Sequence, residues 1–145
     1  MKHLPIFLLL LLPFSLQAQK PYISCDLTEE HSFTTNCEGP ATDKSGNLFV
    51  VNFKTDGTIA IIRPGKSPEL FVTLPEGSVG NGIRFNKAGE MFVADFRGHN
   101  VLKVDPDTRK VSVFAHSSEF NQPNDLAISN SDIIFLSDPN WQDNS

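Results

Sequence analysis

The feature that most constrains the fold is a repeat of 43 residues that begins near residue 38. Three stretches, starting at residues 38, 81 and 124, align without a gap. Four columns run through the alignment: Glu38, Asn81 and Asn124; Gly46, Gly89 and Asp132; Phe49, Phe92 and Phe135; and Asn52, Asp95 and Asp138. Self-similarity at a fixed period is typical of proteins in which like units stack on one another. The chain is therefore predicted to be a repeat protein.

Each unit has the pattern of β-strands. Short runs rich in Val, Ile and Phe follow turn signals such as Ser45-Gly46 and Ala88-Gly89. Besides a strand that enters at the start of each unit, the predicted strands are residues 48–53, 58–62 and 70–74 in the first unit and 91–96, 101–104 and 111–114 in the second. Four short strands per unit are typical of a β-propeller blade, so the predicted fold is all-β. A tandem β-sandwich with coincidental spacing is the alternative.

The number of units sets a second expectation. Residues 38–145 supply about two and a half four-stranded blades, because the third unit, from residue 124, is incomplete. Propellers close with about four to eight blades. An arc this short leaves an unpaired sheet edge and half of a core. We therefore expect a piece of a longer protein, or a chain that assembles with others, with residues 19–37 as an N-terminal lead-in.

Residues 1–18 have the order of a secretory signal peptide. Met1 to His3 is a short positive start, Leu4 to Phe14 is apolar, and a cut after Ala18 is predicted. The apolar run is too short to span a bilayer comfortably. We expect an exported protein, periplasmic or extracellular, with no membrane segment after cleavage. The formal charge of −5, without a cluster of Lys and Arg, argues against nucleic acid as a partner.

Two cysteines, Cys25 and Cys37, are separated by 11 residues. An exported chain meets an oxidising compartment, which permits a disulfide between them. Two free thiols are the alternative, since only the pairing geometry decides. No spacing of Cys and His resembles a zinc site.

Two of the repeat columns carry side-chain oxygens. The column of Glu38, Asn81 and Asn124 enters the first strand of each unit, and the column of Asn52, Asp95 and Asp138 ends the second strand. The two columns are equidistant from the intervening turn, so they are expected to face each other across a hairpin, near one mouth of the central channel. Carboxylate and amide oxygens suit calcium or magnesium better than zinc or copper. The alternative is that Asn and Asp at strand ends are simple turn residues.

Three segments carry a resemblance to a known family. They are Glu38-Gly39-Pro40-Ala41, Gln122-Pro123-Asn124-Asp125-Leu126 and Phe135-Leu136-Ser137-Asp138-Pro139. Together they are similar to segments of the gluconolactonase and regucalcin (senescence marker protein) family. The likeness runs from about Phe33 to the end of the chain. It implies a six-bladed propeller with one catalytic divalent cation in the channel, usually Ca²⁺, with Mg²⁺, Mn²⁺ or Zn²⁺ as other candidates.

The resemblance also implies roles for single residues. Glu38 matches the first metal ligand of the family and Asn124 the second. The remaining ligands, and with them the catalytic residues, would lie beyond Ser145. Asn81, Asp125 and Asp138 are carried as residues that contact substrate or line the channel. Regucalcin-like members carry an Arg at the position of Gln122, so the preferred sugar lactone is open.

The expected function is an exported, calcium-dependent sugar-lactone hydrolase in which a metal-activated water opens a lactone ring. Its partner is a small-molecule lactone. The chain alone is expected to be inactive, because half of the ligand set is missing. A non-catalytic propeller that binds a protein or carbohydrate at the channel mouth is the alternative. Trp141 is expected in the loop over that mouth, where packing and stacking on a ligand are both open.

Overall fold

The computed structural model describes residues 24–141, and this part of the chain is all-β. The predicted signal peptide, residues 1–18, and residues 19–23 of the lead-in lie outside the described residues. Among the described residues, no helix is long and apolar enough to cross a membrane.

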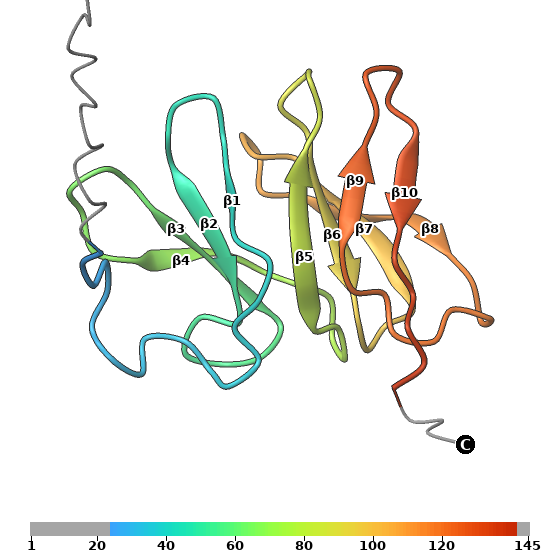
Figure 1. Cartoon of the computed structure of the whole chain (residues 1–145), viewed down its shortest axis with the longest axis horizontal. Coiled ribbons are helices and arrows are strands. Elements are labelled where there is room, and N and C mark those ends of the chain that lie inside the picture. The colour runs from blue at the N-terminus through green and yellow to red at the C-terminus, as the bar shows by residue number, and fades with distance from the viewer. Residues whose placement is uncertain (1–23, 142–145) are drawn as a thin grey trace, which may run out of the picture.

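Ten strands form three antiparallel sheets in which neighbours follow chain order (Figure 1). The first sheet contains β1 (Ala41–Thr42), β2 (Leu48–Val51), β3 (Thr58–Ile62) and β4 (Glu69–Thr73). The second contains β5 (Gly80–Phe85), β6 (Met91–Asp95), β7 (Asn100–Val104) and β8 (Val111–His116), and the third contains β9 (Leu126–Ile128) and β10 (Ile134–Leu136). We call them the first, second and third blade. This confirms the predicted all-β fold of about two and a half blades.

The 43-residue period holds down to single hydrogen bonds in the first turn of each blade. The amides of Asp43, Asn86 and Ser129 donate to the carbonyls of Asn47, Glu90 and Ile133 at 3.0, 3.1 and 2.9 Å. The repeat column of Gly46, Gly89 and Asp132 lies in this turn, and its residues have a left-handed backbone with φ of 80°, 89° and 59°. Glycine adopts this conformation freely, and Asp is among the few other residues that tolerate it. The repeat column therefore marks a backbone requirement.

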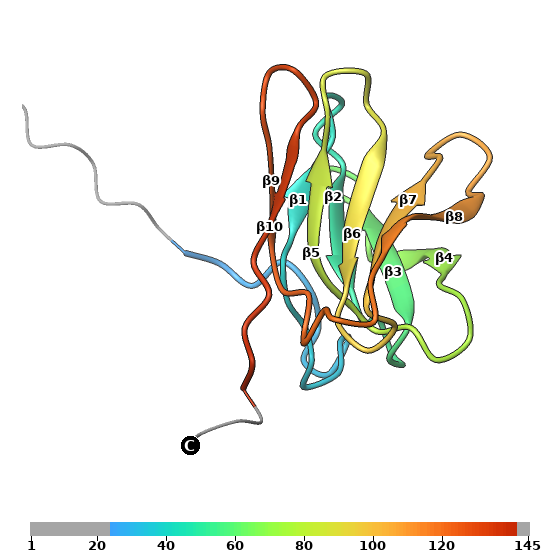
Figure 2. The same cartoon turned by 90° about the vertical axis from the view of Figure 1, so that its right-hand side faces the viewer.

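The blades pack face to face, as Figures 1 and 2 show. One apolar cluster joins the first blade to the second, and another joins the second blade to the third. The ring of Phe49 lies 5.2 Å from the ring of Phe85 on the neighbouring blade. Phe49 and Phe92 are 2% and 4% exposed, whereas Phe135, in the same column, is 62% exposed. The Phe column faces the following blade, and the described residues hold no blade beyond the third.

The first strands of adjacent blades approach each other at their backbones. The amide of Gly82 donates to the carbonyl of Asn124 at 2.7 Å, and the amide of Ile83 donates to the carbonyl of Gly39 at 3.2 Å. A Cβ added at Gly82 would lie 2.5 Å from Oδ1 of Asp125, and one added at Gly39 would lie 2.4 Å from Cα of Gly82. Glycine at these two positions lets three blades converge.

One detail differs from the sequence-based expectations, and a second concerns a point that the sequence left open. A bulge in the second blade pairs Asp95 with Gly80, so the expected pairing of Asp95 with Asn81 is wrong. Of the two alternatives for the cysteines, the structure holds Cys25 and Cys37 as free, exposed thiols and shows no disulfide between them.

Replacing Gly82 by Ala should lower the free energy of unfolding by about 1–3 kcal/mol, because the new methyl group meets the backbone of the next blade. Urea denaturation measures the loss. Gly89→Asp is the matched control, because Gly89 has open space around it and the third blade carries Asp at this left-handed position. It should cost about 1 kcal/mol or less. Equal losses in the two variants would contradict the close approach.

Candidate functional site

Glu38, Asn81 and Asn124 lie side by side at the starts of the first strands of the three blades. The backbone bonds at Gly82 and Ile83 join the strand starts in the order 38, 81, 124. Figure 2 shows β1, β5 and β9 next to one another. The three predicted oxygen-bearing residues are therefore brought together, although they are separated by 43 residues in the chain.

In the described part of the chain, the side chains of these three residues are unpaired. Glu38 is exposed, and Asn81 and Asn124 are half-buried. Within residues 24–141, none of the three side chains makes a hydrogen bond or an ion pair, and no buried polar side-chain atom lacks a partner. One carboxylate and two amide groups on neighbouring strand starts are thus unpaired within the described residues.

The side chains that end the second strands are, in contrast, fully engaged. Asp95 is buried and accepts four hydrogen bonds, from Ser78 Oγ at 2.8 Å, Val79 N at 3.0 Å, Gly98 N at 2.9 Å and Asn100 Nδ2 at 2.8 Å. A carboxylate is the side chain that can satisfy four donors without offering one itself. Asp95 therefore ties the entry of β5 to the turn after β6.

In the first blade, Asn52 likewise joins separate segments of the backbone, but through different partners. Its Nδ2 donates to the carbonyls of Asn36 at 2.7 Å and Gly80 at 3.0 Å, while its Oδ1 accepts from the amide of Gly57 at 3.1 Å. Two of the three partners are acceptors, so an amide fits where a carboxylate would not. The choice of Asn at residue 52 and of Asp at residue 95 follows from the partners.

Asp138 follows the pattern of Asp95. Its carboxylate accepts from the amide of Asn121 at 2.9 Å and from the amide of Gln122 at 2.8 Å. These bonds hold the segment that leads into β9. For the column of Asn52, Asp95 and Asp138, the hydrogen bonds favour the alternative that these residues have a structural role. The contact of Asp138 with substrate stays a prediction.

Replacing Asp95 by Ala should cost about 3 kcal/mol or more of unfolding free energy, because four donors in a buried place lose their acceptor. Asp138→Ala is the control from the same column. Its place is only half-buried, so water replaces part of the loss and about 1 kcal/mol is expected. Thermal and urea unfolding measure both. A smaller loss for Asp95→Ala than for Asp138→Ala would contradict this account.

Arg84 was missed by sequence reasoning. Its Nη2 lies 2.7 Å from Oδ2 of Asp125, and its Nη1 donates to the carbonyl of Ile83 at 2.7 Å. The ion pair joins β5 to the segment before β9. Both side chains are more than a third exposed, so the pair contributes little stability. The available signal was that Arg84 stands where the other two units carry Ala41 and Ala127. Asp125, predicted to line the channel or contact substrate, is thus held by a cation next to Asn124.

The thiol of Cys37 adjoins Glu38. Partial desolvation raises the pKa of Cys37, and the carboxylate of Glu38 raises it further. The thiol therefore stays protonated at neutral pH and is a weak nucleophile and a weak metal ligand. The side-chain oxygens of Glu38, Asn81 and Asn124 are better ligands for a metal ion than this thiol.

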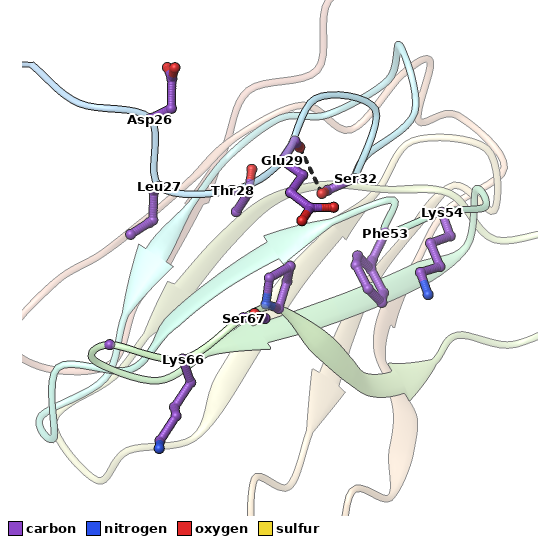
Figure 3. A pocket seen from close by; sticks show the side chains of 11 residues that line it. Asp26, Leu27, Thr28, Glu29, Ser32, Phe53, Lys54, Lys66 and Ser67 are labelled. Carbon is purple, nitrogen blue, oxygen red and sulfur yellow. Dashed lines mark hydrogen bonds between the residues drawn. The ribbon is translucent and has the colours of Figure 1, made fainter.

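A cavity of about 580 Å³ lies elsewhere, between the lead-in segment and the first blade (Figure 3). Its walls include Leu27, Glu29, Phe53, Lys54 and Lys66. Glu38, Asn81 and Asn124 do not line it. The cavity mixes both signs of charge with apolar surface. The strand starts, which carry the residues of the family resemblance, remain the candidate site.

The donors at the strand starts fit part of a site for a hard cation. The described residues contain no group of three or more His, Cys, Asp and Glu that could hold a metal ion. Glu38, Asn81 and Asn124 offer oxygen ligands of the kind that Ca²⁺ prefers. Ca²⁺ takes about six to eight such oxygens, so these three supply part of a set.

Comparison with known proteins supports a propeller fold and finds a similarity in sequence to a gluconolactonase. No family model matches the chain. The chain is 29% identical over 116 residues to the gluconolactonase of Zymomonas mobilis, an alignment that covers 70% of this chain and 33% of that protein. The chain thus spans about a third of the length of this relative. The likeness suggests the gluconolactonase family.

The solved structures show the fold. A catalytically inactive virginiamycin B lyase of Staphylococcus aureus with quinupristin matches with a TM-score of 0.61 and 14% identity, over 70% of this chain and 34% of that one. The selenomethionine form of that lyase matches with a TM-score of 0.60 and 9% identity, over 79% and 37%. The three sheets are therefore propeller blades.

Proposed function

We propose that the protein containing this chain is an exported lactone hydrolase of the gluconolactonase kind that depends on a divalent cation, Ca²⁺. The similarity to a gluconolactonase supports the reaction class. One observation in the structure carries the proposal. Within residues 24–141, the side chains of Glu38, Asn81 and Asn124 stand on neighbouring strand starts without a hydrogen-bond partner, while the side chains of Asn52, Asp95 and Asp138 are engaged in hydrogen bonds that hold the fold.

Glu38 and Asn124 would hold the cation, with Asn81 beside them. When bound, the cation supplies a Lewis acid for the lactone carbonyl and lowers the pKa of a water molecule. Glu38 contributes the negative charge that a divalent cation needs, and Asn124 contributes a neutral oxygen that leaves net positive charge for the substrate. The chemistry requires no nucleophilic side chain.

The surrounding residues keep the ligands in place. Asp95 ties the entry of β5 to the turn after β6, and Asp138 ties the entry of β9 to the segment after β10, so the backbone close to Asn81 and Asn124 is held in place. Arg84 holds Asp125 and places a cation close to Asn124. Ligands held in advance lose less freedom when they bind. The engaged column therefore serves the free column.

The test is the substitution Glu38→Gln in the intact protein, with hydrolysis of glucono-δ-lactone followed in a pH-stat and calcium binding followed by calorimetry. We expect kcat/KM to fall about 100-fold or more and calcium affinity at least about 10-fold, because a neutral amide replaces the charged ligand. Chelation of the cation should abolish the wild-type rate, and added calcium should restore it.

Glu76→Gln is the matched control, because Glu76 is exposed in a turn of the first blade. It should leave rate and affinity unchanged. If Glu38→Gln kept both the rate and the calcium affinity, the enzyme proposal would fail. The non-catalytic propeller that binds a protein or carbohydrate would then be favoured.

A further inference from the structure

A cavity of about 500 Å³ lies between the first and second blades, at the end opposite to the strand starts of the candidate site. Its walls are residues 42–45 in the first turn of the first blade, residues 85–87 and 89 in the first turn of the second blade, and Pro106 in the turn after β7. Figure 1 shows these first turns at the upper end of the blades. Both blades are four-stranded and pack on each other, so this inter-blade cavity differs from the open face of the third blade.

Two lysines stand on the walls of the inter-blade cavity at the same position of the repeat. Lys44 and Lys87 are 43 residues apart, and Nζ of Lys44 donates a hydrogen bond to the backbone carbonyl of Lys87. The ammonium group of Lys44 therefore reaches from one turn to the other. Within residues 24–141, the side chain of Lys87 makes no ion pair. The third unit carries Asn130 at this position, so the pair of cations occurs between the first two blades and is not repeated at the third.

The carboxylates near the two lysines are engaged elsewhere. Asp43 accepts hydrogen bonds from two backbone amides of its own turn, each at 2.9 Å. Asp105, in the turn that carries Pro106, is likewise bound by two amides of its own turn at 2.9 Å. Glu90 forms an ion pair with Lys103, whose hydrogen bond lowers the pKa of Glu90. In the described part of the chain, two ammonium groups thus line the cavity without a carboxylate partner.

Apolar side chains form another part of the wall. Phe85 and Pro106 line the inter-blade cavity, and both are half-buried. The ring of Phe85 is held by Phe49 of the first blade, with ring centroids 5.2 Å apart. A concave site that combines apolar walls with a few charged groups is typical of small-molecule binding, and the volume lies within the usual range of about 300–1,000 Å³.

We propose that the inter-blade cavity binds a small organic carboxylate, with the carboxylate between Lys44 and Lys87 and an apolar group against Phe85 and Pro106. Each ammonium group is a compact positive charge with three donors, so two of them can hold both oxygens of a carboxylate. The apolar wall favours an anion that has an apolar part over inorganic phosphate or chloride. None of the four residues belongs to the candidate site, so this binding is independent of the proposed function.

Saturation-transfer NMR on the intact protein, with benzoate as the probe, tests the site without any turnover. We expect saturable binding that weakens as salt is added, because salt screens the lysines. Lys87→Gln should weaken the binding about 10-fold, since a charged hydrogen bond to the carboxylate is lost. Lys87→Arg keeps the charge and should stay within about threefold of the wild type. Lys44→Gln gives a second reading, with a loss of about 10-fold as well.

Lys66→Gln is the matched control, because Lys66 is an exposed lysine in a turn of the first blade and does not line the inter-blade cavity. It removes the same charge and should leave the binding of benzoate unchanged. Two analogues separate the parts of the ligand. Benzyl alcohol lacks the charge and acetate lacks the ring, so each should bind at least about 10-fold more weakly than benzoate.

Equal binding of benzoate to the wild type and to Lys87→Gln, or equal binding of benzoate and benzyl alcohol, would overturn the proposal. Binding that requires calcium or is lost in Glu38→Gln would also overturn it, because benzoate would then occupy the candidate site. A protein that binds benzoate through Lys87 but hydrolyses no lactone would support the carboxylate site and refute the lactonase. Calcium-dependent hydrolysis without saturable benzoate binding would refute the carboxylate site and leave the lactonase standing.

Discussion

The close contact between the starts of neighbouring first strands is the constraint on which the rest of the structure depends. Three strand starts converge because Gly39 and Gly82 have no side chain, and the carbonyls of Gly39 and Asn124 accept hydrogen bonds from the strand between them. Any Cβ at these glycines would push the blades apart. The same contact places Glu38, Asn81 and Asn124 beside one another, so the geometry that packs the blades also assembles the candidate site.

The two columns of oxygen-bearing residues differ in how far the fold uses their side chains. Side chains that end the second strands have every polar atom engaged, and their choice of Asn or Asp follows the chemistry of their partners. Side chains that enter the first strands have no partner within the described residues. A polar group that the fold does not use is available to a ligand. Hydrogen-bond accounting therefore separates residues that look alike in the sequence.

Sequence alone predicted the fold where the signals are local. The turns at Gly46, Gly89 and Asp132 need a left-handed residue, and the strands between them carry the apolar pattern of buried sheet. The bulge at Gly80 was not predicted, because the repeat spacing does not reveal a register shift within a blade. The ion pair of Arg84 with Asp125, 41 residues apart, was not predicted either, because it joins two blades. The neighbouring positions of Glu38, Asn81 and Asn124 were predicted because the repeat carries three-dimensional information. The partners of Asp138 were not, since no repeat or motif encodes them.

A crystal structure of the intact protein grown with calcium tests the central claim most directly. The account predicts one Ca²⁺ bound by a carboxylate oxygen of Glu38 and the amide oxygen of Asn124, each at about 2.4 Å, with the backbone bond from Gly82 to Asn124 unchanged. A structure in which calcium binds elsewhere, or in which the side chains of Glu38 and Asn124 are engaged with other protein groups, would contradict it.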